Sequence, residues 1–150
     1  MAAVFRSCGI CSLRIGCFLI AGYTLFLALL LLSFSTHDLY YARNYIIWSR
    51  VLYFVFAVLL FVAAVCLFTG TKRSSRQLLG VWVVVFANFI LFEIISVCYN
   101  IYYYNDSYYP MPLGLRQSAL SNILVFGLLI FLNIICLLAV HSHRSTIIGF

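Results

Sequence analysis

The sequence predicts an all-α integral membrane protein: a four-helix bundle with short loops and both termini in the cytoplasm. Its composition is 66% apolar and 8% charged, too little polar surface to cover a water-soluble globule of 150 residues. It also contains four apolar runs of about 20 residues, the length at which a helix crosses the hydrocarbon core. Stretches such as YFVFAVLLFVAAV are apolar at every position, whereas membrane β-strands alternate. Lipid is therefore the expected solvent.

The four apolar runs are expected to form one tetraspan membrane domain over residues 1–150, with no separate soluble domain. The predicted spans are residues 15–34, 51–69, 78–101 and 119–140. Arg6 and Arg14 precede the first run, as basic residues precede a secretory signal. The run is longer than a usual signal core and ends in LLLLSFSTHD without a small-x-small cleavage pattern, so we expect a retained signal anchor.

The distribution of basic residues predicts the orientation. With both ends in the cytoplasm, six basic residues lie in inner segments and three in outer loops. The inner residues are Arg6, Arg14, Lys72, Arg73, Arg76 and Arg144, and the outer ones are Arg43, Arg50 and Arg116. Because these residues are dispersed in short connectors beside apolar segments, membrane topology explains the net charge of +6 better than a nucleic-acid partner does.

Both outer connections, residues 35–50 and 102–118, are rich in aromatic residues. The candidate partner-binding tyrosines are Tyr102, Tyr103, Tyr104, Tyr108 and Tyr109. Tyrosine also favours the headgroup zone, so the alternative interpretation is an aromatic belt at the membrane surface without a protein partner. Asn105 begins an N-x-S sequence and is a candidate for N-glycosylation on the outer side.

Three cysteines, Cys8, Cys11 and Cys17, lie near the inner mouth of the first span. Thiols beside the membrane and next to arginines are candidates for S-palmitoylation, with inert cysteines as the alternative. Cys8 and Cys11 form a CxxC pair, but zinc needs further ligands, which His141 and His143 at the other cytoplasmic end could lend. We expect no metal ion.

Small residues recur seven positions apart in three spans. The pairs are Ala21 and Ala28, Ala57 and Ala64, and Gly80 and Ala87. Heptad spacing keeps small residues on one face of a left-handed helix pair, where backbones approach closely. These faces are expected to point inward.

Glu93 is the one acidic residue inside a predicted span. An ionised group at mid-bilayer costs about 2.5–3.5 kcal/mol, so Glu93 is expected to face protein, with protonation as a way to avoid the charge. Counting 1.5 Å per residue places Tyr23 and Thr24 near its depth as candidate partners. The same count places Asn88 and Asn133 at nearly equal depth, which predicts an amide pair between them. A transport or proton-relay role for Glu93 is the alternative to helix packing.

The last six residues, STIIGF, place Ile148 and Phe150 at alternate positions before the terminal carboxylate. Such a tail fits the groove of a hydrophobic-class PDZ domain, and an apolar tail lying on the membrane is the alternative. The sequence contains no nucleotide loop, nucleophile–base pair or paired carboxylates, since its acids are Asp38, Glu93 and Asp106. We therefore expect neither an enzyme nor a cofactor.

The segment CGICSLRIGC, residues 8–17, resembles the opening of lysosome-associated transmembrane proteins of the LAPTM type. It is still more similar to small insect tetraspan proteins of the Pasiflora type, found at septate junctions. The matching residues are Cys8, Cys11, Ser12, Leu13, Arg14 and Gly16. The resemblance implies a non-enzymatic four-helix protein that organises a junction or assists the trafficking of its partners. The chain lacks a cytoplasmic PPxY motif, and its nearest counterpart, residues 109–112, lies on the outer side.

These observations together predict a multi-pass protein that organises cell–cell junctions of the septate type, or complexes of membrane partners, through its aromatic outer loops. The expected location is the plasma membrane, with the endosomal or lysosomal membrane as the alternative. The alternative function is an accessory subunit or small transporter that uses Glu93.

Overall fold

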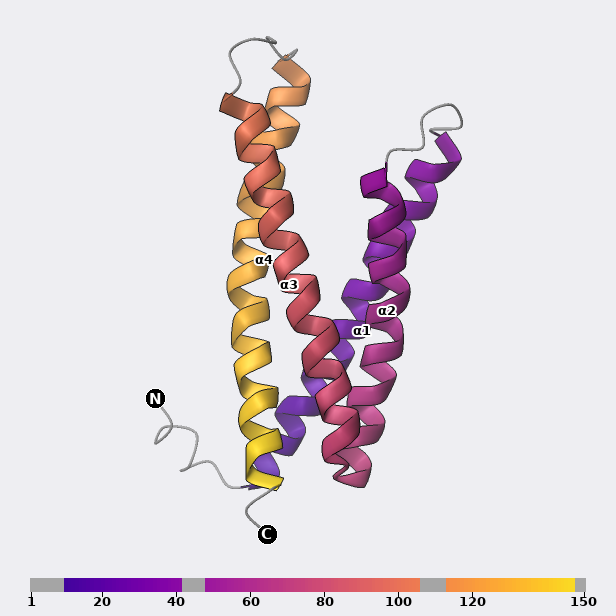
Figure 1. Ribbon diagram of the computed structural model, residues 1–150, viewed down its shortest axis with the longest axis vertical. Helices are drawn as coiled ribbons and strands as arrows, with labels where there is room; N and C mark the ends of the chain where they lie inside the picture. The colour runs from indigo at the N-terminus through magenta and orange to yellow at the C-terminus, as the bar shows by residue number, and fades with distance from the viewer. Residues whose placement is uncertain (1–9, 42–47, 106–112, 148–150) are drawn as a thin grey trace. The chain divides into compact units, whose positions relative to one another are not determined.

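The computed structural model describes residues 10–41, 48–105 and 113–147, and these residues form helices and no strand. The four helices are α1 (Ile10–Tyr41), α2 (Trp48–Arg73), α3 (Arg76–Asn105) and α4 (Leu113–Thr146) (Figure 1). Each contains an apolar segment long enough to cross a membrane: Arg14–Thr36, Val51–Arg73, Arg76–Tyr102 and Ile123–Thr146. The predicted all-α fold class with four spans is confirmed, and the chain is a multi-pass membrane protein. Each helix extends beyond its predicted span because the flanking polar residues continue the same helix.

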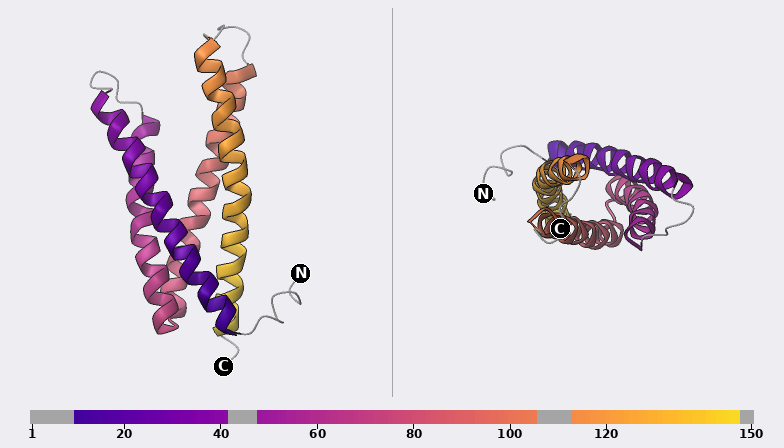
Figure 2. Two further views of the ribbon diagram at one scale, coloured as in Figure 1. Left: turned by 180° about the vertical axis from the view of Figure 1, so that it is seen from behind. Right: turned by 90° about the horizontal axis from the view of Figure 1, so that it is seen from above.

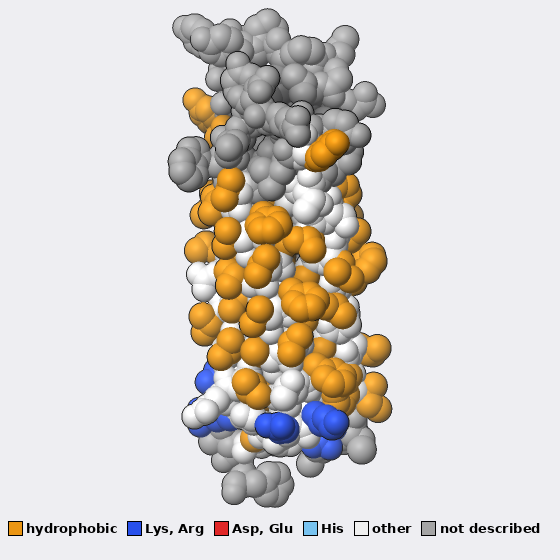
Figure 3. All heavy atoms as spheres, turned by 90° about the vertical axis from the view of Figure 1, so that its right-hand side faces the viewer, with side chains coloured by type: hydrophobic (Ala, Val, Ile, Leu, Met, Phe, Trp, Pro, Cys, Tyr) orange, Lys and Arg blue, Asp and Glu red, His pale blue; other side chains and the backbone are white. Residues whose placement is uncertain are grey.

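Large apolar side chains are exposed along all four helices. Leu19, Leu128 and Phe131 are each more than two-thirds exposed. On the face seen in Figure 3, hydrophobic side chains run along the helices and Lys and Arg side chains gather at one end. This surface is suited to lipid, since an apolar side chain loses nothing by facing acyl chains.

The chain divides into two compact units. The first comprises residues 1–86 and 138–150, and the second comprises residues 87–137. The first unit therefore holds α1, α2, the first turns of α3 and the last turns of α4, and the second holds the remainder of α3 and α4. In the first unit α1 and α2 pack against each other, with α1 slanting across α2 (Figures 1 and 2).

Small residues line the seam between α1 and α2. Ala21, Ala28, Ala57 and Ala64 are each at most 4% exposed, which confirms the inward faces predicted for the first two spans. Five of the buried residues of α2 follow a heptad pattern: Ala57, Leu60, Ala64, Leu67 and Thr71, with Ala63 and Gly70 buried beside them. This alternation of small and large residues allows the close packing typical of left-handed helix pairs.

The small-residue face predicted for the third span is wrong. Ala87 is exposed, and Gly80 is only partly covered. The buried stripe of α3 instead consists of large side chains at helical spacing: Leu79, Trp82, Phe86, Phe89, Ile90 and Glu93. Bulky aromatic residues occupy the inward positions of α3, so Ala87 lies off the buried stripe.

A two-residue turn joins α2 to α3. Ser74 adopts a left-handed conformation with φ of 51°, and the N–H of Ser75 donates to the carbonyl of Gly70 at 2.9 Å. This six-residue closure is the Schellman pattern that ends a helix. A methyl group at Gly70 would lie 3.0 Å from Cβ of Leu78 and 3.2 Å from the backbone nitrogen of Leu79. Glycine is thus required there because α3 folds back tightly against α2.

Several helix ends meet at one end of the first unit, called here the basic end. Nη2 of Arg14, in the second turn of α1, donates to Oγ of Ser74 at 3.1 Å. The guanidinium of Arg144, near the end of α4, lies against Gly80, where an added Cβ would approach Nη2 to 3.3 Å. The basic end also holds Lys72 and Arg73 in the last turn of α2 and Arg76 at the start of α3. The described start of α1 and end of α4 therefore lie together, and their cytoplasmic location stays a prediction.

Candidate functional site

The second unit contains a buried polar pair inside the membrane-spanning helices. Nδ2 of Asn133 on α4 donates a hydrogen bond to Oε2 of Glu93 on α3 at 2.8 Å. Glu93 is 2% exposed and Asn133 is fully buried. The residues next to Glu93 and Asn133 along each helix are apolar, so the pair is a specific polar contact between α3 and α4 in a medium that cannot supply water.

The structure brings Glu93 together with a residue that the sequence analysis assigned elsewhere. Asn133 was expected to bond Asn88, which is exposed, and the Asn88–Asn133 pair stays a prediction. Thr24, an expected partner of Glu93, donates its hydroxyl proton to the carbonyl of Ile20 at 2.8 Å instead. Depth counted along a helix axis is not depth in the membrane, because helices tilt and begin at different levels. The sequence therefore identified both members of the pair but not the pairing.

A second buried polar contact, which the sequence analysis missed, lies in the first unit. Nε1 of Trp82 on α3 donates to Oγ1 of Thr24 on α1 at 3.3 Å, and both residues are fully buried. The indole ring of Trp82 also stacks on Phe86, with centroids 4.4 Å apart and planes inclined by 18°. The available signal was the Trp82 indole itself, because a buried indole N–H needs an acceptor. Sequence alone could not choose among the hydroxyl groups.

The contact between Glu93 and Asn133 limits what this site can do chemically. A single carboxyl can take up or release one proton or accept hydrogen bonds, and the amide of Asn133 donates one of those bonds to Oε2. Within the described ranges, no group of three or more His, Cys, Asp or Glu residues is placed to hold a metal ion. The geometry is that of a contact between two helices in which one residue, Glu93, can be protonated.

Exposed tyrosines occupy the ends of α1 and α3 remote from their basic residues. Tyr40 is 72% exposed in the last turn of α1, and Tyr99 and Tyr102 are 61% and 69% exposed near the end of α3. Asn105, the glycosylation candidate, is the last residue of α3 and is exposed. The backbones of Tyr103 and Tyr104 are helical but their side chains, like all of Tyr108 and Tyr109, lie outside the described part of the chain.

The remaining candidates fall at the chain ends. Cys17 is 1% exposed, so its burial does not favour acylation there. Cys8, Ile148 and Phe150 lie outside the described residues, as does the side chain of Cys11. His143 is buried, and its Nδ1 has no hydrogen-bond partner among the described residues.

The chain was compared with protein-family models, with curated proteins and with solved structures, and none of them matches it. The resemblance of residues 8–17 to LAPTM-type and Pasiflora-type proteins stays a prediction that rests on its own residues.

Proposed function

We propose that this multi-pass membrane protein has no enzymatic activity and organises cell–cell junctions of the septate type, or complexes of other membrane proteins, through its aromatic outer ends. The supporting observation is the exposure of Tyr99 and Tyr102 in the last turns of α3, with Tyr40 similarly exposed at the end of α1. Tyrosine is enriched at interfaces because its ring is apolar and its hydroxyl can still bond. The helices thus present tyrosines at the ends from which a neighbouring molecule would approach.

The proposal includes an orientation and a location. Placing the basic end in the cytoplasm satisfies the positive-inside bias and directs the tyrosines outward. The plasma membrane is the proposed location, and the endosomal or lysosomal membrane is the alternative. In this orientation a PDZ-type partner at Ile148 and Phe150 would be cytoplasmic.

The tyrosines are tested by serine substitution. Changing Tyr102, Tyr103, Tyr104, Tyr108 and Tyr109 to serine should lower the recovery of neighbouring proteins by at least about tenfold, because interface tyrosines are frequent hot spots. Recovery is measured by proximity labelling from the outer face of native cells. The matched control changes the same five residues to phenylalanine, which keeps the rings and should retain most of the recovery. Unchanged recovery in the serine variant, at equal surface delivery, contradicts the proposal.

The second candidate function is transport or an accessory role in transport, and the burial of the Glu93 carboxyl within the span favours it. Glu93→Gln keeps an acceptor oxygen for Asn133 but cannot release a proton. If Glu93 titrates during transport, the variant should assemble and reach the surface normally while a proton- or solute-dependent flux falls to background. If the variant only weakens folding or partner recovery, the transport candidate fails.

A further inference from the structure

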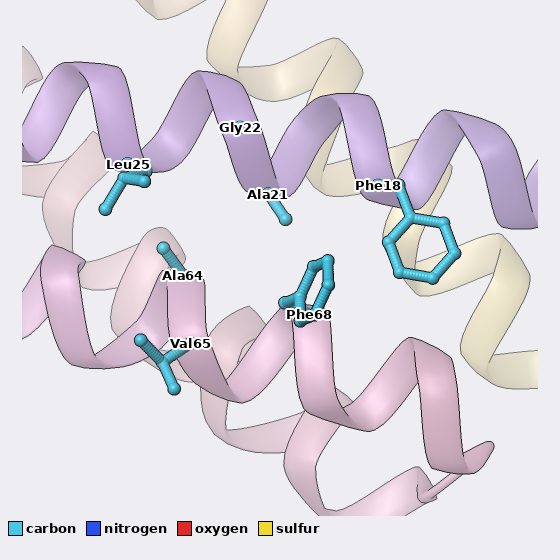
Figure 4. Close-up of a pocket in the computed structure, with 7 residues that line it drawn as sticks. All are labelled: Phe18, Ala21, Gly22, Leu25, Ala64, Val65 and Phe68. Atoms are coloured by element: carbon cyan, nitrogen blue, oxygen red, sulfur yellow. The ribbon is translucent and has the colours of Figure 1, made fainter.

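A groove opens between α1 and α2 on the surface of the first unit. It is lined by Phe18, Ala21, Gly22 and Leu25 of α1 and by Ala64, Val65 and Phe68 of α2 (Figure 4). Its volume is about 330 Å³, at the low end of the range for small-ligand pockets. Small residues at three lining positions leave this space, and every lining residue is apolar. The groove therefore fits one slender apolar chain.

On each of the two helices, the residues that line the groove are followed, one turn toward the basic end, by a basic residue. On α1, Arg14 lies one turn before Phe18 on the same face, and on α2, Lys72 lies one turn after Phe68. The rings of Phe18 and Phe68 meet edge to face, with centroids 5.2 Å apart. Arg14 and Lys72 are both exposed. The bond from Arg14 to Ser74, two residues beyond Lys72, places the two cations at the same end of the groove.

The distance along α1 from Arg14 to Leu25, at the far end of the groove, matches one leaflet of a bilayer. From Arg14 to Leu25, the helix rises about 16 Å at 1.5 Å per residue. Half of a hydrocarbon core is about 15 Å. A headgroup held near Arg14 would thus let an acyl chain follow the groove to the middle of the membrane.

The basic residues at the basic end have no acidic side chain near them in the sequence, so an anion that neutralises them would come from another molecule. The acidic residues are Asp38, Glu93 and Asp106, and none of them lies within one helical turn, in sequence, of Arg14, Lys72, Arg73, Arg76 or Arg144. Basic residues beside a span attract anionic lipids of the cytoplasmic leaflet.

We propose that the groove and its two cations bind one anionic phospholipid. The headgroup, through its net negative charge, lies on Arg14 and Lys72, and one acyl chain fills the space over Ala21, Gly22 and Ala64. A neutral lipid or a sterol would fill the groove without matching the cations. The lipid is an integral part of the α1–α2 surface whether or not the aromatic ends bind a partner.

The headgroup is tested on the full-length protein, purified in detergent and given equal amounts of dioleoyl phosphatidylserine and dioleoyl phosphatidylcholine. Native mass spectrometry should show preferential retention of phosphatidylserine. The double variant Arg14→Gln/Lys72→Gln should lower that preference by about 25-fold, since a cation near an anionic lipid contributes about fivefold. Both sites are exposed, so the variant leaves the α1–α2 core intact.

The acyl chain is tested by filling the groove. An added Cβ at Gly22 meets nothing within 4 Å, so Gly22→Leu projects into free space and should abolish retention of phosphatidylserine. Gly16→Leu is the matched control, because Gly16 is on the same helix, is equally unobstructed and does not line the groove. It should retain the lipid.

Three results overturn the proposal. Equal retention of the two lipids would show that Arg14 and Lys72 do not select the anionic lipid. Displacement of phosphatidylserine by soluble glycerophosphoserine in both Gly22→Leu and the unchanged protein shows a headgroup site without a chain site. A lipid-free dimer that Gly22→Leu dissociates shows that the groove receives a second copy of the chain instead.

Discussion

Replacing Trp82 by alanine is expected to lower the free energy of unfolding by about 3–5 kcal/mol, the range for removing a large buried aromatic side chain. Trp82 is fully buried, stacks on Phe86 and donates its indole N–H to Thr24. Alanine would leave a cavity and also free the hydroxyl of Thr24 from its donor. The measurement is reversible unfolding of the purified protein by titration with SDS in mixed micelles.

Two further substitutions separate the volume of Trp82 from its hydrogen bond. Trp82→Phe keeps most of the ring volume and loses the donor, so it should cost only about 1–2 kcal/mol. Thr24→Val removes the acceptor while keeping the shape, and should cost a similar amount. If Trp82→Ala unfolds at the same SDS fraction as the unchanged protein, Trp82 does not anchor α3 on α1 and the description of this core is wrong.

Replacing Asn133 by leucine is expected to lower the free energy of unfolding by about 1–3 kcal/mol. The substitution removes the donor that reaches Oε2 of Glu93 and leaves a buried carboxyl without it. The cost exceeds the value of an ordinary interhelical hydrogen bond in a membrane, about 0.6 kcal/mol, because the carboxyl stays behind in an apolar medium. The same SDS titration measures the change.

The matched control is Asn100→Leu in the third helix. Nδ2 of Asn100 donates to the carbonyl of Ser96 at 2.8 Å, within its own helix, so its loss should cost well below 1 kcal/mol. The double variant Glu93→Leu/Asn133→Leu removes both polar groups and should recover most of the stability lost in Asn133→Leu. A double variant that is less stable than Asn133→Leu alone would show that Glu93 makes its main contribution elsewhere.

The heptad spacing of small residues predicted the buried faces of α1 and α2 correctly but not that of α3. Ala21, Ala28, Ala57 and Ala64 were predicted to face inward, and all are buried. The same rule was wrong for Ala87, because the inward positions of α3 belong to Trp82, Phe86 and Phe89. Heptad spacing of small residues identifies a helix face that can be buried. Where large aromatic residues lie on another face of the same helix, that face is buried instead. In lipid both faces are apolar, so hydropathy cannot decide between them.

The sequence by itself determined the medium and the elements: four apolar runs too long for a soluble core and too continuous for strands require membrane-spanning helices, because lipid offers no partner for an unpaired backbone group. It also singled out Glu93 and Asn133 as polar residues in those helices. Only the tertiary structure decided that these two residues bond each other, that Trp82 reaches Thr24, and that Arg14 and Lys72 stand at one end of a groove. Such pairings depend on the tilt, rotation and relative level of packed helices, which side-chain contacts set and which residue counting along a single helix does not contain.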